Sequence, residues 1–153
     1  MKKTRKGFTL VELLIVIAVL GVLTAMMQLS GTNAAASAKA AAIVNSLQTW
    51  RTAVSMYVAE NAGGTPAIAT FETNKDNYVD ADAFGEDTSK YEFAAGTGEG
   101  NTDKWYVTYT LPTANATKIK EKLKERAATD KLLAGAADTP NYTDGDTVSM
   151  RVH

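Results

Sequence analysis

Apolar residues follow two different patterns along the first sixty positions of the chain. Residues 8–29 are almost all apolar and carry a single charged side chain, Glu12. A run of ~20 apolar residues makes a helix long enough to cross a bilayer. Further on, apolar residues recur at steps of four, three, four and three, which is one stripe along an amphipathic helix; they are Ile43, Leu47, Trp50, Val54 and Tyr57.

These two patterns together predict one helix from Phe8 to Asn61, because only Ser30-Gly31 interrupts the helix-favouring residues between them. At 1.5 Å per residue such a helix is ~80 Å long. Gly63-Gly64 and Pro66 are typical of the residues that end a helix. The helix is therefore expected to be apolar all round in its first half and amphipathic in its second.

Apolar residues with a period of two predict three strands in the second half of the chain. The first strand covers Tyr91 to Ala95, and a glycine-rich loop joins it to a second strand over 105–111 as an antiparallel hairpin. A third strand is expected from Thr147 to Val152. Thr113 to Ala128 predicts a helix whose inner stripe is Ala116, Ile119, Leu123 and Ala127.

The expected fold is α+β, with a long N-terminal helix, the spine, packed on a small antiparallel sheet that forms a head. The strand residues facing the spine are expected to be Trp105, Val107, Tyr109, Leu111, Val148 and Met150. With the spine stripe, Ile119 and Leu123 they make the predicted core of the head. The loosest region is Thr65 to Asp103, an acidic connection with a short helix expected around Asp80 to Phe84.

A basic leader precedes the apolar helix. It contains no acid and four cationic residues, which are Lys2, Lys3, Arg5 and Lys6. Positive residues before a spanning helix remain on the cytoplasmic side, so the rest of the chain is expected outside. Three segments follow: a leader of residues 1–7, a membrane-spanning or filament-core half-helix of residues 8–33, and a head of residues 34–153.

The junction of leader and helix reads Gly7-Phe8-Thr9-Leu10-Val11-Glu12, and it resembles the N-terminus of type IV prepilins and pseudopilins. The resemblance covers about thirty residues. It implies that a prepilin peptidase cleaves between Gly7 and Phe8 and methylates the new amine of Phe8. It also implies that Glu12 receives the N-terminal amine of a neighbouring subunit during assembly. One departure is Leu29, where the family often has a proline.

The resemblance implies a structural protein, inserted in the inner membrane as a single-pass precursor and then assembled into an extracellular homo-oligomeric filament by the pilus assembly machinery. The leading interpretation is a major pilin of a surface fibre used for adhesion or motility. The alternatives are a pseudopilin of a type II secretion system, a minor pilin that binds DNA or another ligand, and a membrane-anchored or secreted binding domain. In the last case Glu12 is an interfacial acid, or Ala36-Ser37-Ala38 is an ordinary signal-peptidase site and the mature chain begins at Lys39.

Composition removes most catalytic chemistry from consideration. The chain has no cysteine, and its single histidine, His153, is expected to be a frayed exposed end. No nucleophile and base can be paired from these residues, so no enzyme activity and no cofactor are expected. Loss of the four leader cations would change the formal net charge from −1 to −5, and an acidic chain is not expected to bind nucleic acid.

Two acidic sets could offer oxygen ligands to calcium, but neither has the EF-hand spacing, and no metal is expected. The first set is Asp76, Asp80, Asp82, Glu86 and Asp87, and the second is Asp138, Asp144 and Asp146. The basic helix from Lys118 to Arg126 suggests a different role for charge. An acidic loop region and a basic helix on one head could meet across subunits of a polymer.

Overall fold

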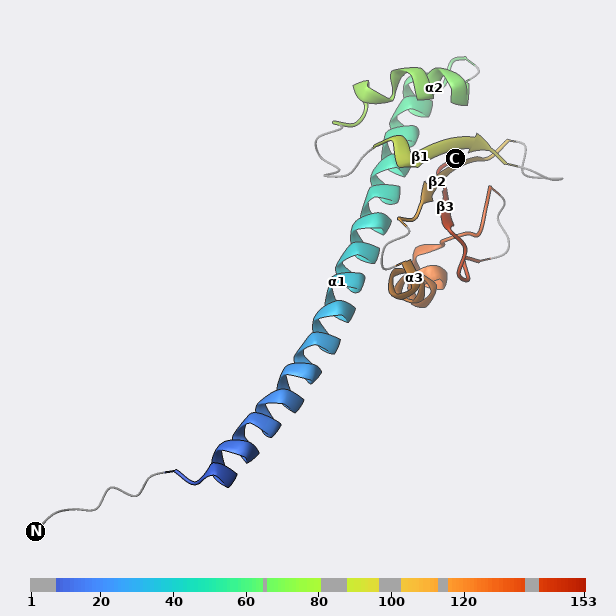
Figure 1. The fold of residues 1–153 in the computed structure, drawn as a ribbon. Helices are drawn as coiled ribbons and strands as arrows, with labels where there is room; N and C mark the ends of the chain where they lie inside the picture. The colour runs from blue at the N-terminus through green and yellow to red at the C-terminus, as the bar shows by residue number, and fades with distance from the viewer. Residues whose placement is uncertain (1–7, 65, 81–87, 97–102, 113–115, 137–140) are drawn as a thin grey trace, which may run out of the picture. The chain divides into compact units, whose positions relative to one another are not determined.

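The computed structural model describes residues 8–64, 66–80, 88–96, 103–112, 116–136 and 141–153, with the backbone alone for residues 28–31 and 88 (Figure 1). Contacts divide the chain into two compact units, Met1–Ala35 and Ala36–His153. Helix α1, Leu10–Glu60, belongs to both units. The second unit also contains α2 (Ile68–Asn74), β1 (Tyr91–Ala95), β2 (Trp105–Thr110), α3 (Ala116–Asp130) and β3 (Thr147–Arg151).

Helix α1 confirms the predicted spine to within two residues at either end. It is unbroken through Leu29 and Ser30-Gly31, because the helix formers on both sides outweigh one glycine. At its end the Asn61 side chain donates to the carbonyl of Tyr57 at 2.8 Å, and the Gly64 N–H donates to Asn61 at 2.9 Å. The Tyr57 carbonyl also accepts from the Asn61 N–H at 3.1 Å, so these bonds fix the turn that follows the helix.

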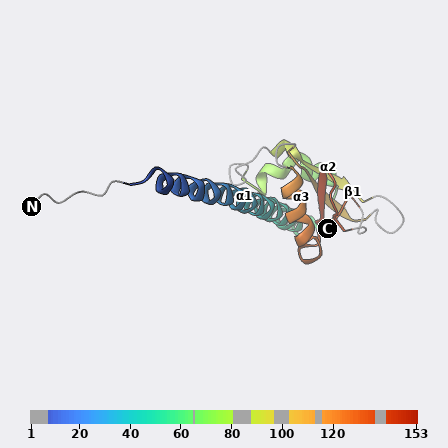
Figure 2. The same ribbon diagram turned by 60° about the horizontal axis from the view of Figure 1, so that its bottom comes forward.

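The sheet has the order β1-β2-β3, and both pairings are antiparallel (Figures 1 and 2). Its register aligns Phe93, Val107 and Met150 across the three strands. The α+β fold with a long helix packed against a small antiparallel sheet is therefore as the sequence predicts. All thirteen residues of the predicted core are at least 93 % buried, and Trp105 is the most exposed of them at 7 %.

The sheet buries residues on both faces, whereas the period of two predicts burial on one face. Tyr106 and Ser149 alternate with the inward residues, yet both are fully buried. Beside Ser149, Leu133 after α3 forms bridges to Ser149 and Asn141, with mutual backbone bonds between Leu133 and Ser149 at 2.8 and 2.9 Å. This segment extends the sheet beyond β3 and brings buried side chains that the sequence did not predict, which are Leu132, Leu133 and Tyr142.

Helix α2 and the 3-10 turn after it, Lys75–Asn77, lie in the region that the sequence predicts as a loose connection, so that prediction is wrong for residues 68–77. Tertiary packing forms them. The fully buried Phe71 ring contacts the rings of Trp50, Tyr57, Tyr78 and Phe93 at centroid distances of 5.3–6.5 Å. The helix expected around Asp80 to Phe84 lies almost wholly outside the described residues.

Two further corrections concern the C-terminal half. Helix α3 continues to Asp130, two residues past the predicted end, and Lys131 then adopts a left-handed conformation with φ of 54°. The end of the chain is not frayed, because the Trp105 N–H donates to the His153 carbonyl at 3.1 Å and the two rings pack at 5.5 Å. His153 itself remains exposed.

Candidate functional site

The start of α1 is held by a reciprocal pair of bonds between Thr9 and Glu12. The Thr9 backbone N–H and hydroxyl both donate to Oε2 of Glu12 at 2.8 Å. The Glu12 N–H donates back to the Thr9 hydroxyl oxygen at 3.2 Å. This is a capping box, in which Thr9 is the N-cap and Glu12 is the third residue of the helix. The pair satisfies donors that the first turn of a helix leaves open.

The capping box gives Glu12 a partner within its own chain. Sequence reasoning described Glu12 as an acid awaiting a positive charge and missed this role. The signal was present, because Thr9-x-x-Glu12 before an apolar run is the usual signature of a capping box. Any positive charge that approaches Glu12 therefore meets a carboxylate already oriented by Thr9.

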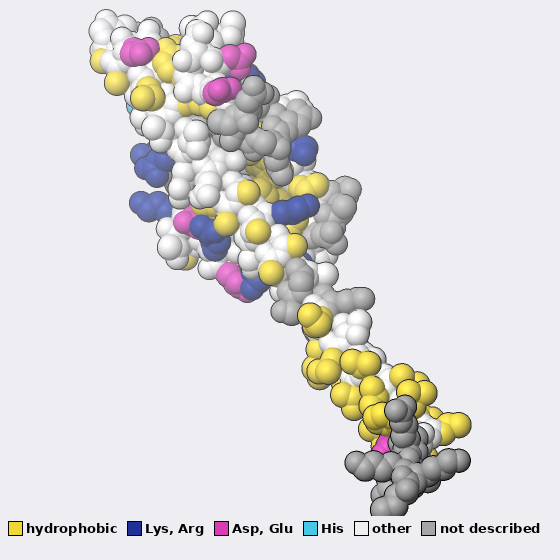
Figure 3. All heavy atoms as spheres, turned by 90° about the vertical axis from the view of Figure 1, so that its left-hand side faces the viewer, with side chains coloured by type: hydrophobic (Ala, Val, Ile, Leu, Met, Phe, Trp, Pro, Cys, Tyr) yellow, Lys and Arg dark blue, Asp and Glu magenta, His cyan; other side chains and the backbone are white. Residues whose placement is uncertain are grey.

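Phe8 precedes the capping box and is 92 % exposed. Gly7 and the cationic leader residues lie outside the described residues, so Phe8 is the only residue of the predicted cleavage junction that the structure describes. Between Leu10 and Met27 the large apolar side chains are 51–79 % exposed. Figure 3 shows them covering this part of α1 on the face in view.

Helix α1 is the one described helix that is long and apolar enough to cross a membrane, and its most apolar stretch is not buried within the chain. Exposed apolar area of this extent requires lipid or another protein to cover it. The unit from Met1 to Ala35 thus combines an accessible residue 8, a capped first turn and an uncovered apolar surface.

A family comparison accounts for this combination. Residues 2–27 match the prokaryotic N-terminal methylation motif. This motif is typical of type IV pilin-like proteins, and it fits a type IV pilin or pseudopilin precursor that is processed by a prepilin peptidase and inserted in the membrane. No curated protein and no solved structure matches the chain.

The described part of the head contains no group of three His, Cys, Asp or Glu side chains placed to hold a metal ion. Asp82, Glu86, Asp87 and Asp138 of the predicted acidic sets lie outside the described residues. Asp146, from the second set, accepts from Lys120 Nζ at 2.6 Å. Together with the motif, the fold fits a structural protein.

The cations of α3 are largely paired within the head. Besides the Lys120–Asp146 pair, Lys122 contacts Glu125 at 2.8 Å and Arg126 contacts Asp130 at 2.7 Å. Three cations of the basic helix that the sequence predicts as a charged surface are therefore neutralised by Glu125, Asp130 and Asp146.

Proposed function

We propose that this chain is the structural subunit of a type IV pilus-like surface filament. A prepilin peptidase removes residues 1–7 and methylates the amine of Phe8. The processed subunit leaves the inner membrane and joins an extracellular homo-oligomeric filament whose centre is formed by residues 8–33. The observation that carries the proposal is the Gly7-Phe8 junction followed by a capped Glu12 within the matched motif.

The capping box refines the part that Glu12 plays in assembly. Cleavage leaves Phe8 with a positive amine, which an incoming subunit brings into the apolar centre of the filament. A charge moved there without a partner is strongly unfavourable, whereas an amine next to a carboxylate is compensated. Glu12 is oriented by Thr9 before the amine of a neighbour arrives, so little reorganisation is needed. The pair then selects the register of adjacent subunits, because other registers leave both charges unpaired.

Three variants separate the charge of Glu12 from its capping role. Glu12→Gln keeps an oxygen that can accept from the Thr9 N–H but has no charge, and Gln occupies this capping position as well as Glu. Glu12→Val removes both functions. Thr9→Val removes the N-cap hydroxyl and leaves the charge. Each is produced as the sole copy in the host, and shear-released filaments and membrane-bound mature protein are quantified.

Charge-directed assembly predicts that Glu12→Gln and Glu12→Val both stop filament formation, while Thr9→Val retains most of it. All three variants should still be cleaved after Gly7, with mass spectrometry showing a mature start at methylated Phe8. Normal filaments from Glu12→Gln alone would mean that Glu12 acts only as a helix cap. A mature start at Lys39 would replace the filament proposal with a secreted domain.

The same motif also fits a pseudopilin, and abundance distinguishes the two. A major subunit should dominate the protein released by shearing cells, whereas a pseudopilin should remain with the cell envelope. The use of the filament in adhesion or motility is part of the proposal for a major subunit. It is tested by comparing surface attachment of cells with and without the gene for this chain.

A further inference from the structure

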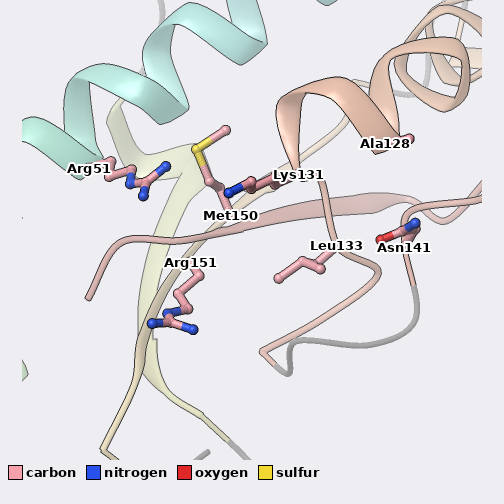
Figure 4. A pocket seen from close by; sticks show the side chains of 7 residues that line it. All are labelled: Arg51, Ala128, Lys131, Leu133, Asn141, Met150 and Arg151. Carbon is pink, nitrogen blue, oxygen red and sulfur yellow. The ribbon is translucent and has the colours of Figure 1, made fainter.

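The head contains a cavity of ≈ 360 Å³ between α1, the end of α3 and β3. Its lining residues are Arg51, Ala128, Lys131, Leu133, Asn141, Met150 and Arg151. Leu133 and Met150 are buried and form an apolar floor. In Figure 4 the side chains of Arg51 and Lys131 reach toward Met150 from two different elements, and Arg151 extends on the other side of β3.

Arg51 and Lys131 are exposed, and within the described part of the chain neither contacts a carboxylate. This distinguishes them from the paired cations of α3. Two positive groups beside one cavity repel each other, and an anion placed between them removes that repulsion. The cavity therefore suits an anionic group carried on an apolar stem, with the charge at the cations and the stem over the floor.

Acidic side chains for which the described residues provide no ion pair occur at a different place on the same head. Glu72 in α2 and Asp76 in the following 3-10 turn are both exposed. The buried Phe71 holds this segment beside Tyr57, near the end of α1. Arg51 and Glu60 are nine residues apart on α1, which is ~14 Å along the helix. Figure 3 shows Asp and Glu side chains at one end of the head, and Lys and Arg side chains together with further acids farther along it.

We propose that the cavity beside Arg51 and Lys131 receives Glu72 or Asp76 of a second copy of this chain. The proposal rests on the proposed function, because it assigns a head contact within the filament. The two surfaces are different patches of one head, so the contact is heterologous, and repeated heterologous contacts generate an open helical polymer. A glutamate also matches the cavity, because its two methylene groups can cover Leu133 and Met150 while its carboxylate reaches the cations.

The first test is a charge-reversal cycle in the full chain, scored as shear-released filament relative to mature protein in the membrane. Lys131→Glu should reduce filaments several-fold, and so should Glu72→Lys combined with Asp76→Lys. The three substitutions together should restore filaments, since the opposite charges again face each other. Lys124→Glu is the matched control, because Lys124 is an exposed cation of α3 away from the cavity, and it should leave filament yield unchanged.

The second test uses the absence of cysteine from the sequence. Lys131→Cys is paired in one chain with Glu72→Cys or with Asp76→Cys, and at least one of the two pairs should give a ladder of disulfide-linked multimers when intact filaments are oxidised. Lys131→Cys alone and Asp76→Cys alone should give no ladder, and Lys124→Cys with Asp76→Cys should give little. This readout does not require the reversed charges to be tolerated, so it decides the proposal even where Lys131→Glu fails to accumulate.

The outcomes separate this inference from the filament proposal. Wild-type cells without filaments would refute the proposed function, and the head contact with it. Normal wild-type filaments together with no ladder and no rescue would refute the contact alone. Loss of filaments in a Lys131→Glu variant that accumulates normally in the membrane, with no rescue by the reversed acids and no ladder, would also overturn it.

Discussion

Truncation of Phe71 tests the part of the head that sequence reasoning missed. Phe71 is fully buried, and its ring contacts four other aromatic rings. Replacing a buried Phe by Ala costs about 3–5 kcal/mol in free energy of unfolding. Aromatic pairs add about 0.5–1.5 kcal/mol each beyond the area they bury, so the upper part of that range is expected for Phe71→Ala.

The assay is thermal unfolding of the Ala36–His153 unit, followed by circular dichroism. For a domain of this size each kcal/mol lowers Tm by about 3–5 °C, so a loss of about 4–5 kcal/mol in Phe71→Ala should lower Tm by about 12–25 °C. Domains have a free energy of unfolding of about 5–15 kcal/mol. For most wild-type values in that range, the Phe71→Ala variant remains folded at low temperature. Loss of α2 from the head should also increase the solvent exposure of Trp50, which is seen in its fluorescence.

Glu72→Ala is the control for the same helix. Glu72 is exposed, and surface substitutions usually change stability by less than about 0.5 kcal/mol, so its Tm should match wild type closely. If Phe71→Ala melts with Glu72→Ala and wild type, α2 does not pack on the spine as described. The acidic surface assigned to Glu72 and Asp76 would then lose its fixed position on the head.

Two further predictions concern the same unit. Burial, with the charges of Asp144 and Asp146 adding to it, raises the pKa of Tyr142 to about 12, above its ordinary value near 10. The neutral phenol is therefore favoured in the folded state, so its contribution to stability is complete below pH ~10 and is lost as pH rises toward ~12. Melts across this window should show a steeper loss for wild type than for Tyr142→Phe, and equal slopes would contradict the assignment. The Tm in calcium should equal the Tm in chelator, since neither acidic set of the sequence has the EF-hand spacing. A large stabilisation by calcium would instead favour a pseudopilin.

Much of the fold could be predicted because its determinants are local. The spine follows from helix-favouring composition and from a stripe at helical spacing, and the strands follow from alternation of apolar and polar residues. Glycines and prolines mark the ends of these elements. The site at residues 7–12 lies in one short segment. The capping box of Thr9 and Glu12 could also have been predicted from that segment, but it was recognised only in the structure.

Tertiary structure alone decided the features that join distant positions. Helix α2 has no strong signal of its own and forms because Phe71 enters an aromatic cluster built by α1 and the sheet. Tyr106 and Ser149 are buried, and Leu133 pairs beyond β3, neither of which alternation along a strand can indicate. The cavity beside Arg51 and Lys131 joins positions eighty residues apart. Whether a cation has a carboxylate partner depends on which distant segments the fold brings beside it. The sequence by itself determined the elements and the motif at the start of the helix, because these depend on near neighbours, whereas packing determined the surfaces that the head presents.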